Sequence, residues 1–176
     1  MNAPVRAGTS VRVVAGRDAQ DMRRIEGFLA EQRASLFHRP AWLQAVEAGT
    51  GQRAAGLVSE RMGVITGWLP LTEVRSALFG KALVSSGFGV GGGIVAESPE
   101  AVRALAAAAE NHAQANGFAS IELRGGPIPQ HWECWDDKHC GFVRPLAGSD
   151  EAELNAIPRK ARAEVRKGLG FGHRVT

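Results

Sequence analysis

The sequence predicts a single α/β domain in which helices cover a mixed sheet. Predicted strands and helices alternate irregularly along the chain, and a predicted hairpin interrupts them. This order argues against a regular parallel barrel. Of the 176 residues, 44% are hydrophobic and 22% are charged, which is ordinary for a globular protein and far from a disordered one. A chain of this length can bury a core of its own.

The first half of the chain is predicted to contain one strand, two helices and a hairpin. The helices follow from apolar residues at helical spacing and from Pro40, which suits a first helical turn. Pro70 cannot donate a ladder hydrogen bond, so we expect a bulge or a free edge there. In chain order we expect a strand over 11–14, helices over 18–33 and 41–47, and hairpin strands over 53–60 and 64–71.

The second half contains the helix with the clearest local signals. Ser98 can cap its first turn, Pro99 suits the first helical position, and Gly117 can adopt the left-handed conformation that ends it. Around it we expect strands over 82–86, 121–123 and 142–144, and helices over 100–116, 150–157 and 158–168.

Positive charge is concentrated near the carboxy terminus. The chain has a formal net charge of +3, yet residues 159–174 contain six Lys/Arg and one acid. The remaining chain has 15 basic and 17 acidic residues, a net charge of −2. An anionic partner should therefore bind this segment rather than the protein as a whole.

Nothing in the sequence predicts a membrane span, a metal site or a cofactor. No apolar run approaches the roughly 18–20 residues of a spanning helix, and the first residues do not resemble a signal peptide, so a cytoplasmic location is expected. Cys134 and Cys140 are interpreted as free thiols. With His131 and His139 they are poorly spaced for tetrahedral zinc.

Residues 87–92 spell the G-x-G-x-x-G pattern of dinucleotide-binding proteins. That pattern holds a diphosphate only where a helix begins within it, and here the chain continues in an extended form to Pro99. We favour a flexible turn, which either brings backbone close to a ligand or simply connects two strands. Residues 167–172 faintly resemble the phosphate loop of acetyl-CoA-dependent acetyltransferases, but that loop follows a strand and opens a helix, so we interpret them as a helix stop and linker.

Four stretches, taken in order, resemble Fem-type peptidoglycan aminoacyltransferases (FemAB-like proteins). The likeness is nearest to the subgroup associated with exosortase and exopolysaccharide systems. The resemblance covers nearly the whole of this chain, and this chain corresponds to about the first half of a complete family member. The stretches are FHRPAWL at 37–43, GVITGWLPL at 63–71, LVSSGF at 83–88 with GGGI at 91–94, and IPRKARAEVRK at 157–167.

The resemblance implies an acetyltransferase-like (GNAT-like) fold that the family carries twice in tandem. It implies a flexible tail over 1–9, one such domain over 10–157, and a basic connecting helix over 158–176 that leads to a second half absent from this sequence. It further implies transfer of an aminoacyl or other acyl group to an amine of a cell-wall or glycan precursor. The acceptor would be linked to a nucleotide diphosphate or lipid diphosphate. The donor, aminoacyl-tRNA or another acyl donor, would bind through the missing half.

The basic helix is the main candidate binding site. Its apolar residues recur every four positions in a narrow stripe, and its cations lie on the opposite side, which favours phosphate binding over DNA or a membrane surface. A solvated helix face and a non-catalytic module that binds nucleotide sugars or RNA remain alternatives. No general base can be named. The predicted substrate-binding residues are Arg159, Lys160, Arg162, Arg166 and Lys167 on this helix, and Trp42, Ser85, Ser86, Gly91 and Gly92 at the acceptor cleft.

Overall fold

A computed structural model describes residues 8–32, 34–78 and 80–173. The chain divides into two compact units, unit 1 over Met1–Cys134 and unit 2 over Trp135–Thr176. The elements of unit 1 are β1 (Ser10–Ala15), α1 (Ala19–Glu31), the 3-10 turn η1 (Leu36–His38), α2 (Pro40–Thr50), β2 (Arg53–Arg61), β3 (Val64–Ser76), β4 (Gly80–Ser85), β5 (Val95–Ala96), α3 (Pro99–Asn116) and β6 (Ser120–Leu123). Unit 2 contains α4 (Asp150–Ala156) and α5 (Arg159–Leu169).

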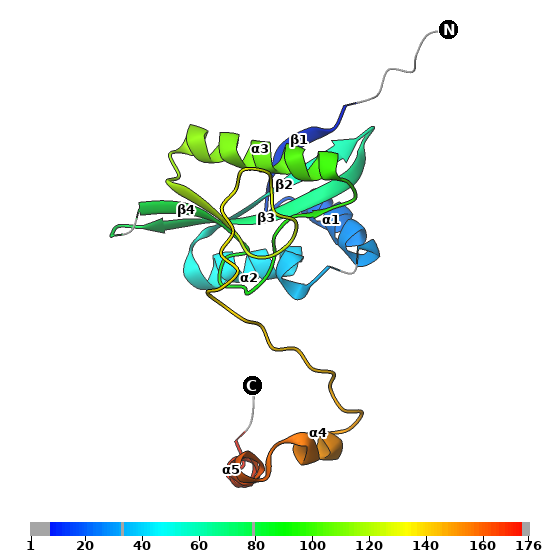
Figure 1. Ribbon diagram of the computed structural model, residues 1–176, viewed down its shortest axis with the longest axis vertical. Coiled ribbons are helices and arrows are strands. Elements are labelled where there is room, and N and C mark those ends of the chain that lie inside the picture. The colour runs from blue at the N-terminus through cyan, green and yellow to red at the C-terminus, as the bar shows by residue number, and fades with distance from the viewer. Residues whose placement is uncertain (1–7, 33, 79, 174–176) are drawn as a thin grey trace. The chain divides into compact units, whose positions relative to one another are not determined.

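Unit 1 is a mixed sheet, as the sequence predicts (Figure 1). Its strands lie in the order β1-β2-β3-β4-β6, and the short β5 also pairs with β3. All pairs are antiparallel except β4 with β6, which is parallel. The parallel pair requires a crossover between the two strands, and α3 provides it.

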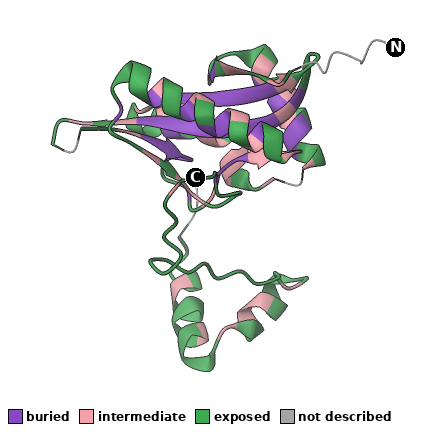
Figure 2. Ribbon diagram, turned by 45° about the horizontal axis from the view of Figure 1, so that its top comes forward, coloured by how far each residue is buried: buried purple, intermediate pink, exposed green. Residues whose placement is uncertain are grey.

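Helices cover both faces of this sheet. One buried cluster joins α1 and α2 to residues such as Val58 and Trp68, and the other joins α3 to Leu57 and Leu69. Consecutive strand residues thus point to opposite clusters, because side chains alternate along a strand. The burial is continuous along the central strands (Figure 2).

The helix ends follow the local signals in the sequence. The Asp18 side chain accepts from two amides in the first turn of α1, and the Ser98 hydroxyl accepts from Ala101 N in α3. Gly117 ends α3 with φ of 67°. Helix α2 continues to Thr50 rather than residue 47, because Gly51, with φ of 71°, supplies its left-handed cap instead of Gly49.

Strand β3 is longer than predicted, and Pro70 marks an interruption beside it. The strand runs to Ser76 because its polar-looking second half pairs with β4. On that side β5 pairs with residues 67–68 and β4 with 72–76, so residues 69–71 have no strand partner there. Pro70 pairs with Gly56 on the other side. Pro70 cannot donate a hydrogen bond to a neighbouring strand, and it lies where β3 has no strand pairing on that side, as expected for proline in a sheet.

Unit 2 is formed by two short helices and the extended segment that precedes them. The predicted strand over 142–144 is wrong: this segment is extended but has no strand partner, so no ladder can form. The helices agree with prediction, and Ser149 caps α4 through Ala152 N. The predicted tail over 1–9 lies mostly outside the described residues. No described helix is long and apolar enough to cross a membrane.

Candidate functional site

The glycine-rich segment forms a loop that leaves the sheet between β4 and β5. Both strands pair with the same side of β3, so the chain leaves this edge after Ser85 and returns to it at Val95. The loop closes on itself, because Ser86 N donates to Gly91 O at 3.3 Å and Gly89 N donates to Ser86 O at 3.1 Å. It contains no helix start, consistent with the rejection of a dinucleotide site.

Side chains from several other elements hold this loop from outside. Trp42 Nε1 donates to Gly87 O at 3.1 Å, and an Arg124 guanidinium nitrogen donates to Gly89 O at 2.7 Å. The Phe37 ring packs against Gly89, where an added Cβ would lie 2.8 Å from the ring, and meets Trp42 edge to face at 4.9 Å. Close packing on Phe37 therefore explains part of the glycine content of this loop.

The predicted cleft residues lie together, but most of them are covered. Ser85 and Ser86 are fully buried, and Gly92 is buried against Ser86. The Ser86 hydroxyl has no hydrogen-bond partner among the described residues. Gly91 and Trp42 are half-buried. In this conformation a ligand could reach those two residues, whereas contact with Ser85 or Ser86 requires the loop to move. Their role in substrate binding stays a prediction.

Beyond the loop, the two chain segments that follow β4 and β6 touch and then separate. Gly93 N donates to Arg124 O at 3.1 Å, and a Cβ added to Gly93 would overlap the Gly125 carbonyl. Gly126, with φ of 80°, also packs closely on Ile94: a Cβ added to Gly126 would lie 2.9 Å from the Ile94 carbonyl oxygen. Only glycine allows this approach, so the contact is made by backbone alone.

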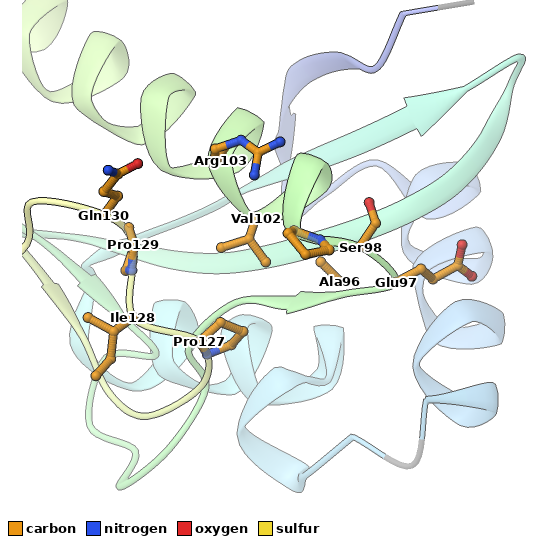
Figure 3. Close-up of a pocket in the computed structure, with 10 residues that line it drawn as sticks. Ala96, Glu97, Ser98, Val102, Arg103, Pro127, Ile128, Pro129 and Gln130 are labelled. Carbon is orange, nitrogen blue, oxygen red and sulfur yellow. The ribbon is translucent and has the colours of Figure 1, made fainter. Parts of the chain in front are cut away.

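A cavity of about 440 Å³ lies beyond this contact, between the separating segments and the first turns of α3 (Figure 3). The residues lining it, mostly apolar and including three prolines, are Ala96, Glu97, Ser98, Pro99, Val102, Arg103, Pro127, Ile128, Pro129 and Gln130. The cavity is shallow and opens widely to solvent. Sequence reasoning missed the cavity, because its walls come from segments about 30 residues apart.

Two opposite charges border the cavity. Glu97 precedes α3 and Arg103 follows on its second turn, and both are exposed. No ion pair joins either side chain to another residue in the described ranges. Pro99, Val102 and Arg103 share one helix face, since they lie three and four positions apart. The cavity thus offers an apolar wall with a free carboxylate and a free guanidinium at its border.

His38 is the histidine nearest to the loop in the fold. Its Nδ1 lies 2.8 Å from the Ser35 hydroxyl, and its backbone carbonyl accepts from Trp68 Nε1 at 2.9 Å. Burial lowers the pKa of His38 below its ordinary value, opposed by backbone hydrogen bonds with Gly93 and Ser35. The imidazole is therefore neutral at pH 7. Sequence reasoning had not singled out this side chain.

A second group of charges missed by sequence reasoning is structural. Glu73 on β3 is 2% exposed and lies 3.0 Å from Arg75, 3.6 Å from Arg53 and 3.4 Å from His112 Nε2. A buried carboxylate requires such partners. Because β3 extends further than predicted, the carboxylate falls inside the sheet, and these contacts join β2, β3 and α3.

The predicted basic helix is present as α5, and its cations differ in whether they contact other residues of the protein. The guanidinium of Arg162 donates to the backbone carbonyls of Asn155 and Ile157 at 2.8–3.1 Å, which links α4 to α5. The other four predicted cations are exposed, and none forms an ion pair within the described part of the chain: Arg159, Lys160, Arg166 and Lys167. Their binding to phosphate stays a prediction.

The cysteine and histidine residues form no recognisable metal site. Cys134 and Cys140 are both free and exposed, and they belong to different units. Within the described ranges, no three potential ligands among His, Cys, Asp and Glu converge.

Comparison with known proteins identifies the fold. No protein-family model and no curated protein sequence matches the chain. A ribosomal-protein-alanine N-acetyltransferase from Brucella melitensis biovar Abortus 2308 superposes with a TM-score of 0.51 at 13% identity, over 79% of this chain and 99% of that one. An aminoglycoside acetyltransferase from an uncultured soil metagenomic sample superposes with the same TM-score in complexes with trehalose and with sisomicin, at 10% and 11% identity, over 79% of this chain and 97% of that one. The predicted fold class is confirmed: the chain has the mixed α/β fold of the GNAT acetyltransferases.

Proposed function

We propose that the protein is an N-acyltransferase, or part of one, that acylates an amine of a cell-wall or glycan precursor carrying a diphosphate. The observation that supports this most strongly is the cavity where the β4 and β6 segments separate, in a sheet of the GNAT-like fold. A cavity at the ends of neighbouring parallel strands is a common place for a substrate site.

The reaction requires two reactants to be held side by side. The lone pair of a neutral amine forms a bond to the acyl carbonyl carbon, and the bond from that carbon to the leaving oxygen of an activated ester breaks. The nitrogen loses one proton and the leaving oxygen gains one, so the step is balanced without a redox partner. Positioning alone can contribute much of the acceleration. A neutral imidazole such as that of His38 can accept the amine proton.

The first turn of α3 does not suit the diphosphate of coenzyme A, the donor that acetyltransferases of this fold use. Pro99 has no N–H, Ala101 N donates to the Ser98 hydroxyl, and Val102 N donates to the Ser98 carbonyl. Only the amide of Glu100 is left in this turn, and Glu97 and Glu100 add two carboxylates beside it. Such a helix start repels an anion rather than binding one. We therefore derive no step from coenzyme A.

Another activated ester then has to supply the acyl group. The resemblance of the sequence to Fem-type transferases supports aminoacyl-tRNA as this donor, and the exosortase-associated subgroup supports a glycan-linked acceptor. In this proposal the acceptor diphosphate binds the four unpaired cations of α5. Charge-assisted hydrogen bonds to phosphate oxygens are about twice as strong as neutral ones.

A titration tests the acceptor site. A nucleotide-diphosphate sugar should bind the wild-type chain at low salt. The double variant Arg159→Gln with Arg166→Gln should raise the Kd at least about tenfold. Charged contacts to phosphate contribute about 1.5–3 kcal/mol each before solvent weakens them. The matched control is Arg61→Gln with Lys81→Gln, two exposed cations of unit 1. Equal Kd values for wild type and the α5 variant would show that α5 is only a solvated face.

A non-catalytic module that binds nucleotide sugars or RNA is the alternative. It is favoured by the burial of Ser85 and Ser86, which closes part of the predicted cleft. RNA binding predicts that long RNA displaces the nucleotide sugar and that its affinity falls steeply with salt. Incubation of the chain with charged tRNA and a precursor amine then separates the two, because only a transferase gives an amide product.

A further inference from the structure

Unit 2 exposes several large apolar side chains. Phe142, Val143 and Leu146 are 93%, 100% and 81% exposed, in the segment that precedes α4. Leu169 and Phe171, at the end of α5, are 70% and 63% exposed. None of residues 135–173 is buried, so these side chains have no core to join within their own unit.

Helix α5 is amphipathic in a specific way. At about 100° per residue, Ala161, Val165 and Leu169 lie within an arc of about 80°. Four of its cations occupy the opposite half of the helix, Arg159, Lys160, Arg166 and Lys167, whereas Arg162 lies beside the apolar arc. Within residues 159–169 five Lys/Arg stand against one acid, Glu164. Phe171 follows directly after the helix and adds an aromatic side chain that the stripe itself lacks.

Among the residues that the structure describes, no ion pair joins an acidic side chain to Arg159, Lys160, Arg166 or Lys167. Glu153 of α4 accepts from both terminal nitrogens of Arg144 and from Ala147 N. That carboxylate is therefore engaged in fixing the segment before the helix. Arg159, Lys160, Arg166 and Lys167 keep their charge available to an outside partner, as described above.

Bare apolar side chains and exposed cations within one small unit match one kind of partner best. An interfacial helix buries a modest apolar face at the boundary of the acyl chains while its Lys and Arg meet anionic headgroups. A nucleic acid would use the cations but leave Phe142, Val143 and Leu146 in water. A second copy of unit 2 would bring two basic helices together, and like charges repel.

We propose that unit 2 is a peripheral membrane-binding element that docks on an anionic lipid surface through α5 and the exposed segment 142–146. The sequence alone disfavours a membrane surface, because the apolar stripe of the helix is thin and lacks Trp or Phe. With the function proposed above, on which this step rests, docking selects a lipid-linked diphosphate as the acceptor rather than a nucleotide-linked one.

Vesicle flotation of the whole chain tests the docking without any donor or acceptor. The chain should float with vesicles containing phosphatidylglycerol and stay behind with vesicles of phosphatidylcholine alone. Arg159→Gln with Arg166→Gln should weaken flotation at least about tenfold, since each cation near an anionic surface contributes about fivefold. Phe142→Ser with Val143→Ser should also weaken it at least about tenfold, because the apolar contact is lost.

Two control pairs keep the test specific. Met62→Ser with Val64→Ser removes exposed apolar side chains of unit 1, and Arg61→Gln with Lys81→Gln removes exposed cations there. Both pairs should float like wild type. The proposal is overturned if the chain does not float with anionic vesicles at low salt. It is also overturned if the Phe142→Ser, Val143→Ser variant floats like wild type, because charge attraction alone would then explain the binding. It is also overturned if the chain dimerises through unit 2 instead.

The outcomes separate the two proposals. Failure of flotation leaves N-acyl transfer to a nucleotide-linked acceptor intact. Absence of any amide product, with flotation intact, refutes the transferase and leaves a membrane-binding protein.

Discussion

Replacing Gly93 with alanine tests the contact that brings the β4 and β6 segments together beside the cavity. A Cβ at this position would overlap the carbonyl of Gly125, and both groups belong to backbone that cannot rotate away. The segments must separate, which strains or breaks the hydrogen bond from Gly93 N to Arg124 O. Overpacking of this kind costs about 1–3 kcal/mol, and the hydrogen bond about 1 kcal/mol more.

The expected destabilisation is thus about 3 kcal/mol, which lowers the Tm of a unit of this size by about 10 °C. Circular dichroism during thermal unfolding measures it. Gly27→Ala is the matched control, because Gly27 lies inside α1, is exposed, and has nothing within 4 Å of an added Cβ. That change should raise stability by about 0.5–1 kcal/mol through helix propensity. A Gly93→Ala protein that melts within about 2 °C of wild type would refute the described contact.

Three further predictions concern the loop, the sheet edge and the cavity. Trp42→Phe removes one hydrogen-bond donor to the glycine loop, so the free energy of unfolding should fall by about 1 kcal/mol in thermal unfolding. Hydrogen exchange should speed up in the loop without changing in α3. Unchanged exchange in the loop would show that Trp42 does not hold it. Arg12 holds the pKa values of Asp21 and Glu60 below their ordinary values, chiefly through side-chain hydrogen bonds. The stability that these ion pairs contribute is present above pH 5 and is lost as the pH falls further, because the carboxylates of the unfolded chain bind protons first. Arg12→Gln should therefore reduce the drop in Tm between pH 6 and pH 3. An unchanged drop would show that Arg12 does not set the pKa values of these two carboxyl groups. Val102→Trp should fill the cavity and lower acyl transfer at least about tenfold while moving Tm by only a few degrees, whereas full activity would exclude the cavity as the substrate site.

Elements with strong local signals could be predicted from the sequence. Helix α3 was bounded to within one residue, because Ser98, Pro99 and Gly117 each act on their immediate neighbours. The hairpin of β2 and β3 and the basic helix α5 were likewise correct. The strand over 142–144 was wrong because a short run of strand-favouring residues forms a strand only where another strand is available to pair with it.

The site was harder to predict because it depends on contacts between distant segments. The glycines of the loop suggested ligand binding, but Gly89 is required by Phe37, about 50 residues earlier. The cavity lies between Glu97 and Ile128, and no local pattern links those positions. The burial of Glu73 depends on the length of β3, which is set by its pairing with β4. The positions of the cations on α5 needed only helical periodicity, so these could be predicted.

The backbone contact at Gly93 and Gly126 separates the part of the chain that maintains the sheet from the part that shapes the cavity. The residues beyond it, such as Val102, Arg103 and Ile128, project from segments that are already held in place. Substitutions there can alter the size and charge of the cavity while the sheet keeps its register. A change in what the cavity binds thus needs only a few substitutions at its wall, each compatible with a folded protein. Libraries restricted to these positions would vary the cavity without disturbing the sheet.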